Sequence, residues 1–143
     1  YVRDVCLLAK MNCVWRLSVK PSDTPEILDM LDQQFGSENY TSQLDWGGGL
    51  VWIGVDEQQL LVASQYGDPD RNGDPDNGIE VLHTNLQYNC GLLGGHATLV
   101  KAPSEARQAL PVFQPEPAPL AKISAGLRAR FDPHGILNPG RMG

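Results

Sequence analysis

The sequence predicts an α+β domain in which one antiparallel sheet carries helices on one of its faces. Three observations predict it. Several short segments show the alternation or the apolar runs of strands, two longer segments show apolar residues at helical spacing, and the helical segments separate the strands in a regular order. The chain of 143 residues is long enough for one domain with a hydrophobic core of its own.

Apolar and polar residues alternate over residues 13–20, the pattern of a strand with one buried face. A helix is expected over 25–35, because a proline suits its first position and apolar residues recur at helical spacing. The hydroxyl of Thr24 is expected to cap this helix, and Gly36 is expected to end it.

Residues 40–46 alternate again, and residues 50–55 are apolar almost throughout. The glycines at 47–49 between these segments predict a turn, so the two segments are expected to form a hairpin. Residues 56–66 are compatible either with an extension of the second strand or with a turn of helix.

Residues 67–78 have the composition of a loop. Asn77 followed by Glu80 resembles a capping box, and apolar residues at helical spacing predict a helix over 79–93. Two glycines end this helix, and residues 96–102 have the pattern of a strand.

The resulting order, β-α-β-β-α-β, is that of the ferredoxin-like plan, with both helices on one face of an antiparallel sheet. We expect an unassigned lead-in over 1–12, the ferredoxin-like domain over 13–110, and a C-terminal helix and tail over 111–143. The last helix has an apolar stripe and is expected to end at Asp132, before a proline.

The chain is acidic, with 17 acidic against 11 basic residues and a net charge of −6. This balance argues against a nucleic acid or an anionic membrane surface as a partner. No apolar segment approaches the roughly 20 residues of a membrane-spanning helix. The three cysteines lack zinc-site or disulfide spacing, so Cys13 and Cys90 are expected as buried thiols in a reducing compartment.

The sequence lacks the glycine-rich phosphate loops, the nucleophile signatures and the histidine spacings that identify catalytic or metal centres. We therefore predict no metal ion, and the catalytic residues remain unknown. Residues 68–73 match the opening of a calcium loop. Its twelfth position is Ile79 instead of a bidentate carboxylate, so any calcium binding is expected to be weak.

The face of the sheet opposite the helices is expected to be polar. Alternation places Arg16 and Ser18 of the first strand on it, and His96 and Thr98 of the last strand beside them. Such a face is either solvated or a docking surface for another domain, and the pattern alone leaves both open.

A specific string lies near the C-terminus, FDPHGILNPGRM at 131–142. It resembles the C-terminal signature of FAD-linked oxidases of the vanillyl-alcohol-oxidase type. Three further segments are similar to the FAD-binding subunit of bacterial glycolate oxidase: WRLSV at 15–19, DWGG at 45–48 and GGHATLV at 94–100. Together these segments extend the resemblance over residues 13–142.

The resemblance implies that this chain corresponds to the C-terminal cap domain that covers the flavin ring. In this family FAD is held mainly by an N-terminal domain, which is absent from this chain. The tail of such proteins returns to that domain, which gives Ile136 and Leu137 a reason to be apolar. The isolated chain is expected to be inactive and to bind FAD poorly.

The partners implied by the resemblance are the missing N-terminal FAD domain, a paralogous FAD subunit and an iron–sulfur subunit. Their complex oxidises a 2-hydroxy acid, glycolate, to glyoxylate. The implied location is cytoplasmic, or at the cytoplasmic side of the membrane through partner subunits.

The residues expected to bind the cofactor or to face the substrate are Arg16, Ser18, His96, Asn138 and Arg141. An arginine suits a bidentate carboxylate clamp, and the alternative is that Arg16 merely bridges the two domains. Two other classes of function also fit the sequence: a free-standing ferredoxin-like module that binds a partner or small ligand without catalysis, and a calcium-responsive adaptor.

Overall fold

The computed structural model describes residues 6–137, with Cys6 described by its backbone alone. Within this range the chain forms an antiparallel sheet of four strands in the order β2-β3-β1-β4. The strands are β1 (Cys13–Ser18), β2 (Thr41–Asp45), β3 (Leu50–Val55) and β4 (His96–Lys101). The strand order and the placement of the helices between the strands confirm the ferredoxin-like α+β prediction.

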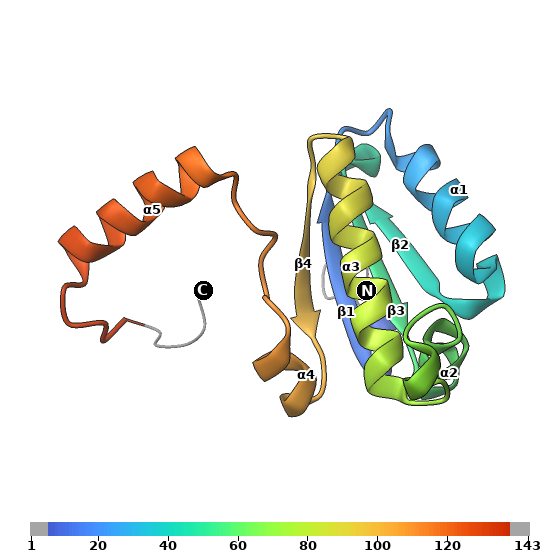
Figure 1. The fold of residues 1–143 in the computed structure, drawn as a ribbon. Helices are drawn as coiled ribbons and strands as arrows, with labels where there is room; N and C mark the ends of the chain where they lie inside the picture. The colour runs from blue at the N-terminus through green and yellow to red at the C-terminus, as the bar shows by residue number, and fades with distance from the viewer. Residues whose placement is uncertain (1–5, 138–143) are drawn as a thin grey trace.

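The two long helices of the domain, α1 (Thr24–Phe35) and α3 (Pro75–Leu92), pack on one face of the sheet (Figure 1). The remaining α-helices are α2 (Glu57–Ser64), α4 (Ser104–Ala109) and α5 (Ala118–Phe131), and short 3₁₀ turns occur at η1 (Cys6–Leu8), η2 (Ser37–Asn39), η3 (Trp46–Gly48) and η4 (Pro69–Arg71).

The core lies between the sheet and these helices. Alternate residues of β1 supply its centre, because Cys13, Trp15 and Leu17 are fully buried. Other buried members from the strands and helices are Ile27, Leu31, Phe35, Val51, Ile53, Val55, Leu60, Ile79, Leu82, Leu86, Cys90, Ala97 and Leu99. The predicted alternation of buried and outward residues in the first strand is therefore confirmed.

Cys13 and Cys90 are buried, free thiols, as predicted. Burial raises the pKa of each thiol to about 12, because the thiolate would be desolvated. Both side chains therefore act as small apolar core groups, and neither is activated as a nucleophile.

The ambiguous segment 56–66 forms a helix, α2, which the sequence pattern left open. Its start is a complete capping box. The Asp56 carboxylate accepts the backbone N–H of Gln59 at 3.0 Å, and the Gln59 side chain accepts the N–H of Asp56 at 2.9 Å. Each residue thus satisfies a backbone donor that a helix start leaves without a partner.

The predicted capping box at Asn77 and Glu80 was wrong, because α3 begins earlier, at Pro75. The Asp74 carboxylate caps the helix by accepting the N–H of Asp76 at 2.9 Å. Asn77 lies inside the helix and is 2% exposed. Its amide nitrogen donates to the backbone carbonyls of Ser64, Asp68 and Arg71, which ties the preceding loop to the helix.

The prediction that the Thr24 hydroxyl caps α1 was also wrong. The hydroxyl of Thr24 donates to the carbonyl of Gly48 in the β2–β3 turn and does not cap the helix. Gly36 ends α1 as predicted: it has φ of +82°, and its N–H donates to the Asp32 carbonyl.

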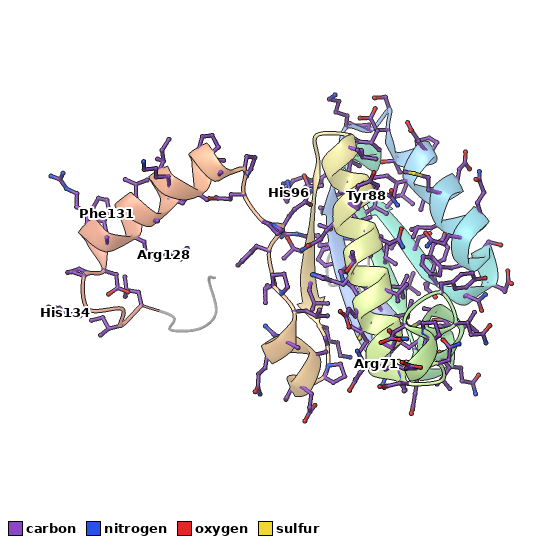
Figure 2. All side chains as sticks on the ribbon, in the orientation of Figure 1. Arg71, Tyr88, His96, Arg128, Phe131 and His134 are labelled. Atoms are coloured by element: carbon purple, nitrogen blue, oxygen red, sulfur yellow. The ribbon has the colours of Figure 1, made fainter. Side chains whose placement is uncertain are left out.

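Helix α5 follows a proline-containing connector and projects away from the sheet (Figure 1). Its apolar stripe is exposed, and so are the two apolar tail residues that follow it: Leu120, Ile123, Leu127, Phe131, Ile136 and Leu137 are 53–77% exposed. Figure 2 shows Phe131 and His134 far from the strands. The helix ends at Phe131, before Asp132, as predicted. No helix in the described part of the chain is long and apolar enough to cross a membrane.

Candidate functional site

The open face of the sheet carries most of the predicted site residues. Pairing of the strands places Arg16 of β1 directly between Trp52 of β3 and Thr98 of β4. Ser18 pairs in the same way with Leu50 and His96, one row further along. Because paired residues of antiparallel strands share a face, these side chains form one surface, which we call the Arg16 face.

The Arg16 face presents the hydrogen-bond donors of Arg16, Ser18, His96 and Thr98. Arg16 and His96 are exposed, Ser18 is half-buried, and Thr98 is 8% exposed. Within residues 6–137, no carboxylate lies within ion-pair distance of Arg16. Asp45 of β2 lies on the same face, at the far end of the row that contains Ser18, but no described ion pair joins it to Arg16. The guanidinium of Arg16 is therefore open to an anionic group.

One end of the open face is covered by the segment that precedes β1. Leu8 is 2% exposed and lies so close to Gly54 that a Cβ there would be 2.7 Å from the Leu8 Cδ2. The Lys101 ammonium donates to the carbonyl of Ala9 at 3.0 Å and holds this segment against β4. The accessible part of the face is therefore the end that carries Arg16, Ser18 and His96.

Trp52 is a large residue of this face that sequence reasoning missed, together with Gln43 and Asp45 of β2. It is half-buried and lies between Arg16 and Gln43 of β2. The apolar run of β3 hides which of its residues point outward, and the register with β1 was needed to place Trp52. Asn138 and Arg141, also predicted as site residues, lie outside the described residues.

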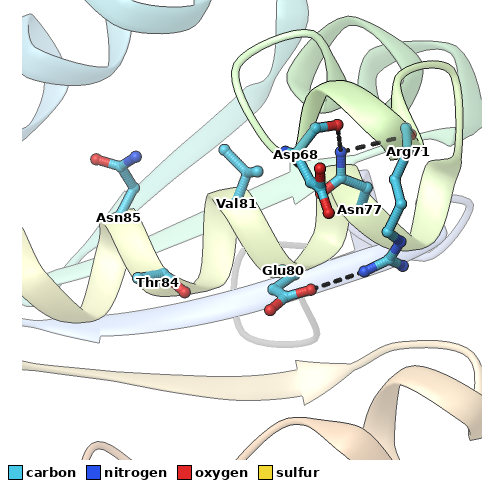
Figure 3. A pocket seen from close by; sticks show the side chains of 7 residues that line it. All are labelled: Asp68, Arg71, Asn77, Glu80, Val81, Thr84 and Asn85. Carbon is cyan, nitrogen blue, oxygen red and sulfur yellow. Dashed lines mark hydrogen bonds and ion pairs between the residues drawn. The ribbon is translucent and has the colours of Figure 1, made fainter.

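A second polar cluster lies where the acidic loop meets the first turns of α3 (Figure 3). A shallow pocket of about 380 Å³ is lined there by Asp68, Arg71, Asn77, Glu80, Val81, Thr84 and Asn85. Arg71 pairs with Glu80 at 3.0 Å and with Asp74 at 3.4 Å, so its charge is already compensated.

The segment that resembles a calcium loop uses its carboxylates for local structure. The Asp68 side chain accepts the backbone N–H of Asp70 at 3.0 Å, and the Asp74 carboxylate caps α3 and pairs with Arg71. In the described part of the chain, no three His, Cys, Asp or Glu side chains lie together in a way that could hold a metal ion.

His83 is a buried histidine that belongs to the core. The Trp15 indole N–H donates to its Nδ1 at 3.2 Å, so the neutral ring carries its proton on Nε2. Nε2 is buried and has no hydrogen-bond partner among residues 6–137, although the ring lies near the Pro111 carbonyl. Burial lowers the pKa of His83 and outweighs the opposite effect of that carbonyl.

The free energy of unfolding is expected to fall as the pH falls below about 6.5, the ordinary pKa of histidine. The unfolded chain then binds a proton that the folded His83, with its lowered pKa, resists, so acid favours unfolding. Urea titrations between pH 7.5 and 5 give the free energy of unfolding at each pH, and hence its slope against pH. It should flatten in His83→Gln, which keeps an acceptor for Trp15, and persist in His96→Gln, which alters an exposed ring. An unchanged slope in His83→Gln would contradict the assignment.

The fold and this face define an open-faced α+β domain whose donor-rich surface is covered by no α-helix among the described residues. The chain is similar to the glycolate oxidase subunit GlcE of Escherichia coli K12, with 30% identity over 99 residues. The match covers 69% of this chain and 20% of GlcE, so the chain spans about a fifth of the length of this relative. No protein-family model matches the chain, and no solved structure matches it significantly.

Proposed function

We propose that this chain is the cap domain of an FAD-dependent oxidoreductase subunit and that the Arg16 face covers the flavin ring. The observation that carries the proposal is the position of Arg16, exposed among donors of neighbouring strands, with no carboxylate of residues 6–137 within ion-pair distance. The similarity to a glycolate oxidase subunit and the C-terminal signature at 131–142 support the same class of enzyme.

The face fits one wall of a flavin site and no more. Rossmann folds hold the pyrophosphate of a dinucleotide with a glycine-rich turn that opens a helix, and this sequence has no such motif. The similarity to a glycolate oxidase subunit supports a separate domain that would hold most of the FAD, which supplies the hydride acceptor when bound. The cap would close over the ring and exclude water from it.

Arg16 is proposed to bind the carboxylate of a 2-hydroxy acid such as glycolate. A guanidinium group can hold a carboxylate through two parallel hydrogen bonds, which fixes its orientation as well as its position. The hydroxyls of Ser18 and Thr98 lie on neighbouring strands and can donate to the same anion. His96 pairs with Ser18 and stands at the rim of this surface.

The exposed stripe of α5 and the apolar tail are proposed to pack on the flavin-bearing domain. Six large apolar side chains with more than half of their surface in water are unusual for a domain that acts alone. Asn138 and Arg141 would reach the same domain. The wider assembly proposed is a cytoplasmic complex with a paralogous FAD subunit and an iron–sulfur subunit.

The experiment replaces Arg16 by alanine in the longer flavoprotein that the proposal requires. We expect kcat/KM for glycolate to fall about 100-fold, as for the loss of one strong transition-state donor, with the flavin content retained. Arg16→Lys should recover part of the activity, and Arg107→Ala, an exposed arginine on α4, should change neither quantity. Unchanged activity and flavin content in Arg16→Ala would refute the proposal. So would stoichiometric FAD binding by the 143 residues alone.

A further inference from the structure

Trp46, in the turn between β2 and β3, combines strain with exposure. Its φ is +51°, and it is the one residue other than glycine with a positive φ among residues 6–137. A bulky side chain in this left-handed region costs free energy that glycine or asparagine would avoid. The indole is nevertheless 78% exposed, so the domain gains little burial in return.

The turn holds Trp46 firmly. The Asp45 carboxylate accepts the Trp46 N–H at 2.7 Å, and the Trp46 carbonyl accepts the N–H of Gly49. The Thr24 hydroxyl binds the carbonyl of Gly48, which joins the turn to the start of α1.

A second bond fixes the turn to the end of β1, where the N–H of Val19 donates to the carbonyl of Gly49 at 3.1 Å. A rigid turn therefore presents a large aromatic side chain to the outside. An exposed tryptophan that is already held in one backbone conformation loses little entropy when it binds. Such residues recur as the energetic centres of protein interfaces.

The position of Trp46 indicates which partner it meets. The residue before it, Asp45, pairs with Leu50, which in turn pairs with Ser18, and Ser18 pairs with His96. This row is the end of the Arg16 face that the lead-in segment leaves uncovered. Trp46 thus stands at the margin of the surface proposed to meet the flavin-bearing domain.

We propose that Trp46 is the anchor of this interface and inserts into an apolar pocket of the flavin-bearing domain, with a hydrogen-bond acceptor for its indole N–H. The inference rests on the proposed function, because it takes its partner from there. It adds the residue that binds the two domains together, apart from the anion site at Arg16. The competing explanation is that Trp46 stabilises the cap itself. In that case Trp46→Asn lowers the melting temperature of the isolated chain, whereas the anchor role predicts an unchanged or higher one.

The test compares Trp46→Asn with Tyr88→Ala. Tyr88 is a similarly exposed aromatic residue, 65% exposed, but it lies on α3, on the helix-covered side of the sheet (Figure 2). In the 143-residue chain, Trp46→Asn should leave the melting temperature unchanged or raise it, because asparagine tolerates the left-handed conformation. In the longer flavoprotein it should speed hydrogen exchange of the strand amides at 16–18 and 96–98 at least tenfold, as the cap detaches. Tyr88→Ala should not.

The outcomes separate the two proposals. The wild-type flavoprotein should protect these amides relative to the isolated chain. If it does and Trp46→Asn does not weaken the protection, the proposal that Trp46 anchors the interface is wrong, and the proposed cap function stands. A lower melting temperature of Trp46→Asn in the isolated chain, with protection retained, assigns Trp46 to the turn and overturns the anchor. If the longer polypeptide holds no flavin and gives no protection, the proposed function itself fails.

Discussion

Replacing Gly78 by alanine is expected to lower the free energy of unfolding by about 3 kcal/mol, the upper range for overpacking a close contact. Gly78 lies where α3 crosses α2, and a Cβ there would be 2.0 Å from the Leu60 carbonyl oxygen. Backbone atoms cannot turn aside as a side chain can. The two helices must therefore separate, which opens the core around Leu60 and Ile79.

Gly126 offers a matched control, because it also lies in a helix, α5, but a Cβ there would meet nothing within 4 Å. Gly126→Ala should be neutral or stabilise α5 by up to about 1 kcal/mol, the difference in helix propensity. Urea unfolding followed by circular dichroism measures both variants. Equal stability of Gly78→Ala and wild type would show that the two helices can move apart at no cost.

The strands and long helices could be predicted because each buries one face. In β1 the alternation alone identified Trp15 and Leu17 as core and Arg16 as outward. The bounds shifted by a few residues where local chemistry decided them. The end of β1 at Ser18, two residues before the predicted end, is one example.

The segment between β3 and α3 could not be predicted, because identical local signals lead to different structures. The sequence Gly-Asp-Pro-Asp occurs at 67–70 and again at 73–76. In both copies the aspartate before proline accepts the backbone N–H two residues later. The first copy makes only a 3₁₀ turn, η4, whereas the second begins the 18 residues of α3.

The difference between the two copies comes from what each can pack against. After the second copy, Gly78 and Ile79 fit closely against α2, and Ile79 is buried in the core. After the first copy, Asn72 and Gly73 remain exposed, so a continued helix would bury nothing. Tertiary packing, which no local pattern contains, therefore selects the helix start.

The candidate site was predictable in part for the same reason. Alternation placed Arg16, Ser18 and His96 on one face, but it could not place Trp52, whose strand is apolar on both sides. The cover that Leu8 provides over Gly54 is a contact between chain segments far apart in sequence. This contact forms only because the segment before β1 packs against the sheet. The composition of that segment did not indicate such packing.

The core itself is expected to depend most strongly on Trp15. Trp15→Ala should lower the free energy of unfolding by about 3–5 kcal/mol, the usual cost of removing a fully buried aromatic side chain. The loss has two parts. A cavity is left at the centre of the sheet, and His83 Nδ1 loses the indole N–H that satisfies it in the core.

A second pair of variants separates these two parts. Trp15→Phe keeps most of the apolar volume but leaves His83 Nδ1 without its donor, so we expect a loss of about 1–3 kcal/mol for the unsatisfied group. In a His83→Leu background that acceptor is absent, and Trp15→Phe should then cost less than it does alone. Urea unfolding of the four proteins gives the coupling energy. Strictly additive losses would show that the Trp15–His83 hydrogen bond contributes nothing to stability, and that packing alone makes Trp15 indispensable.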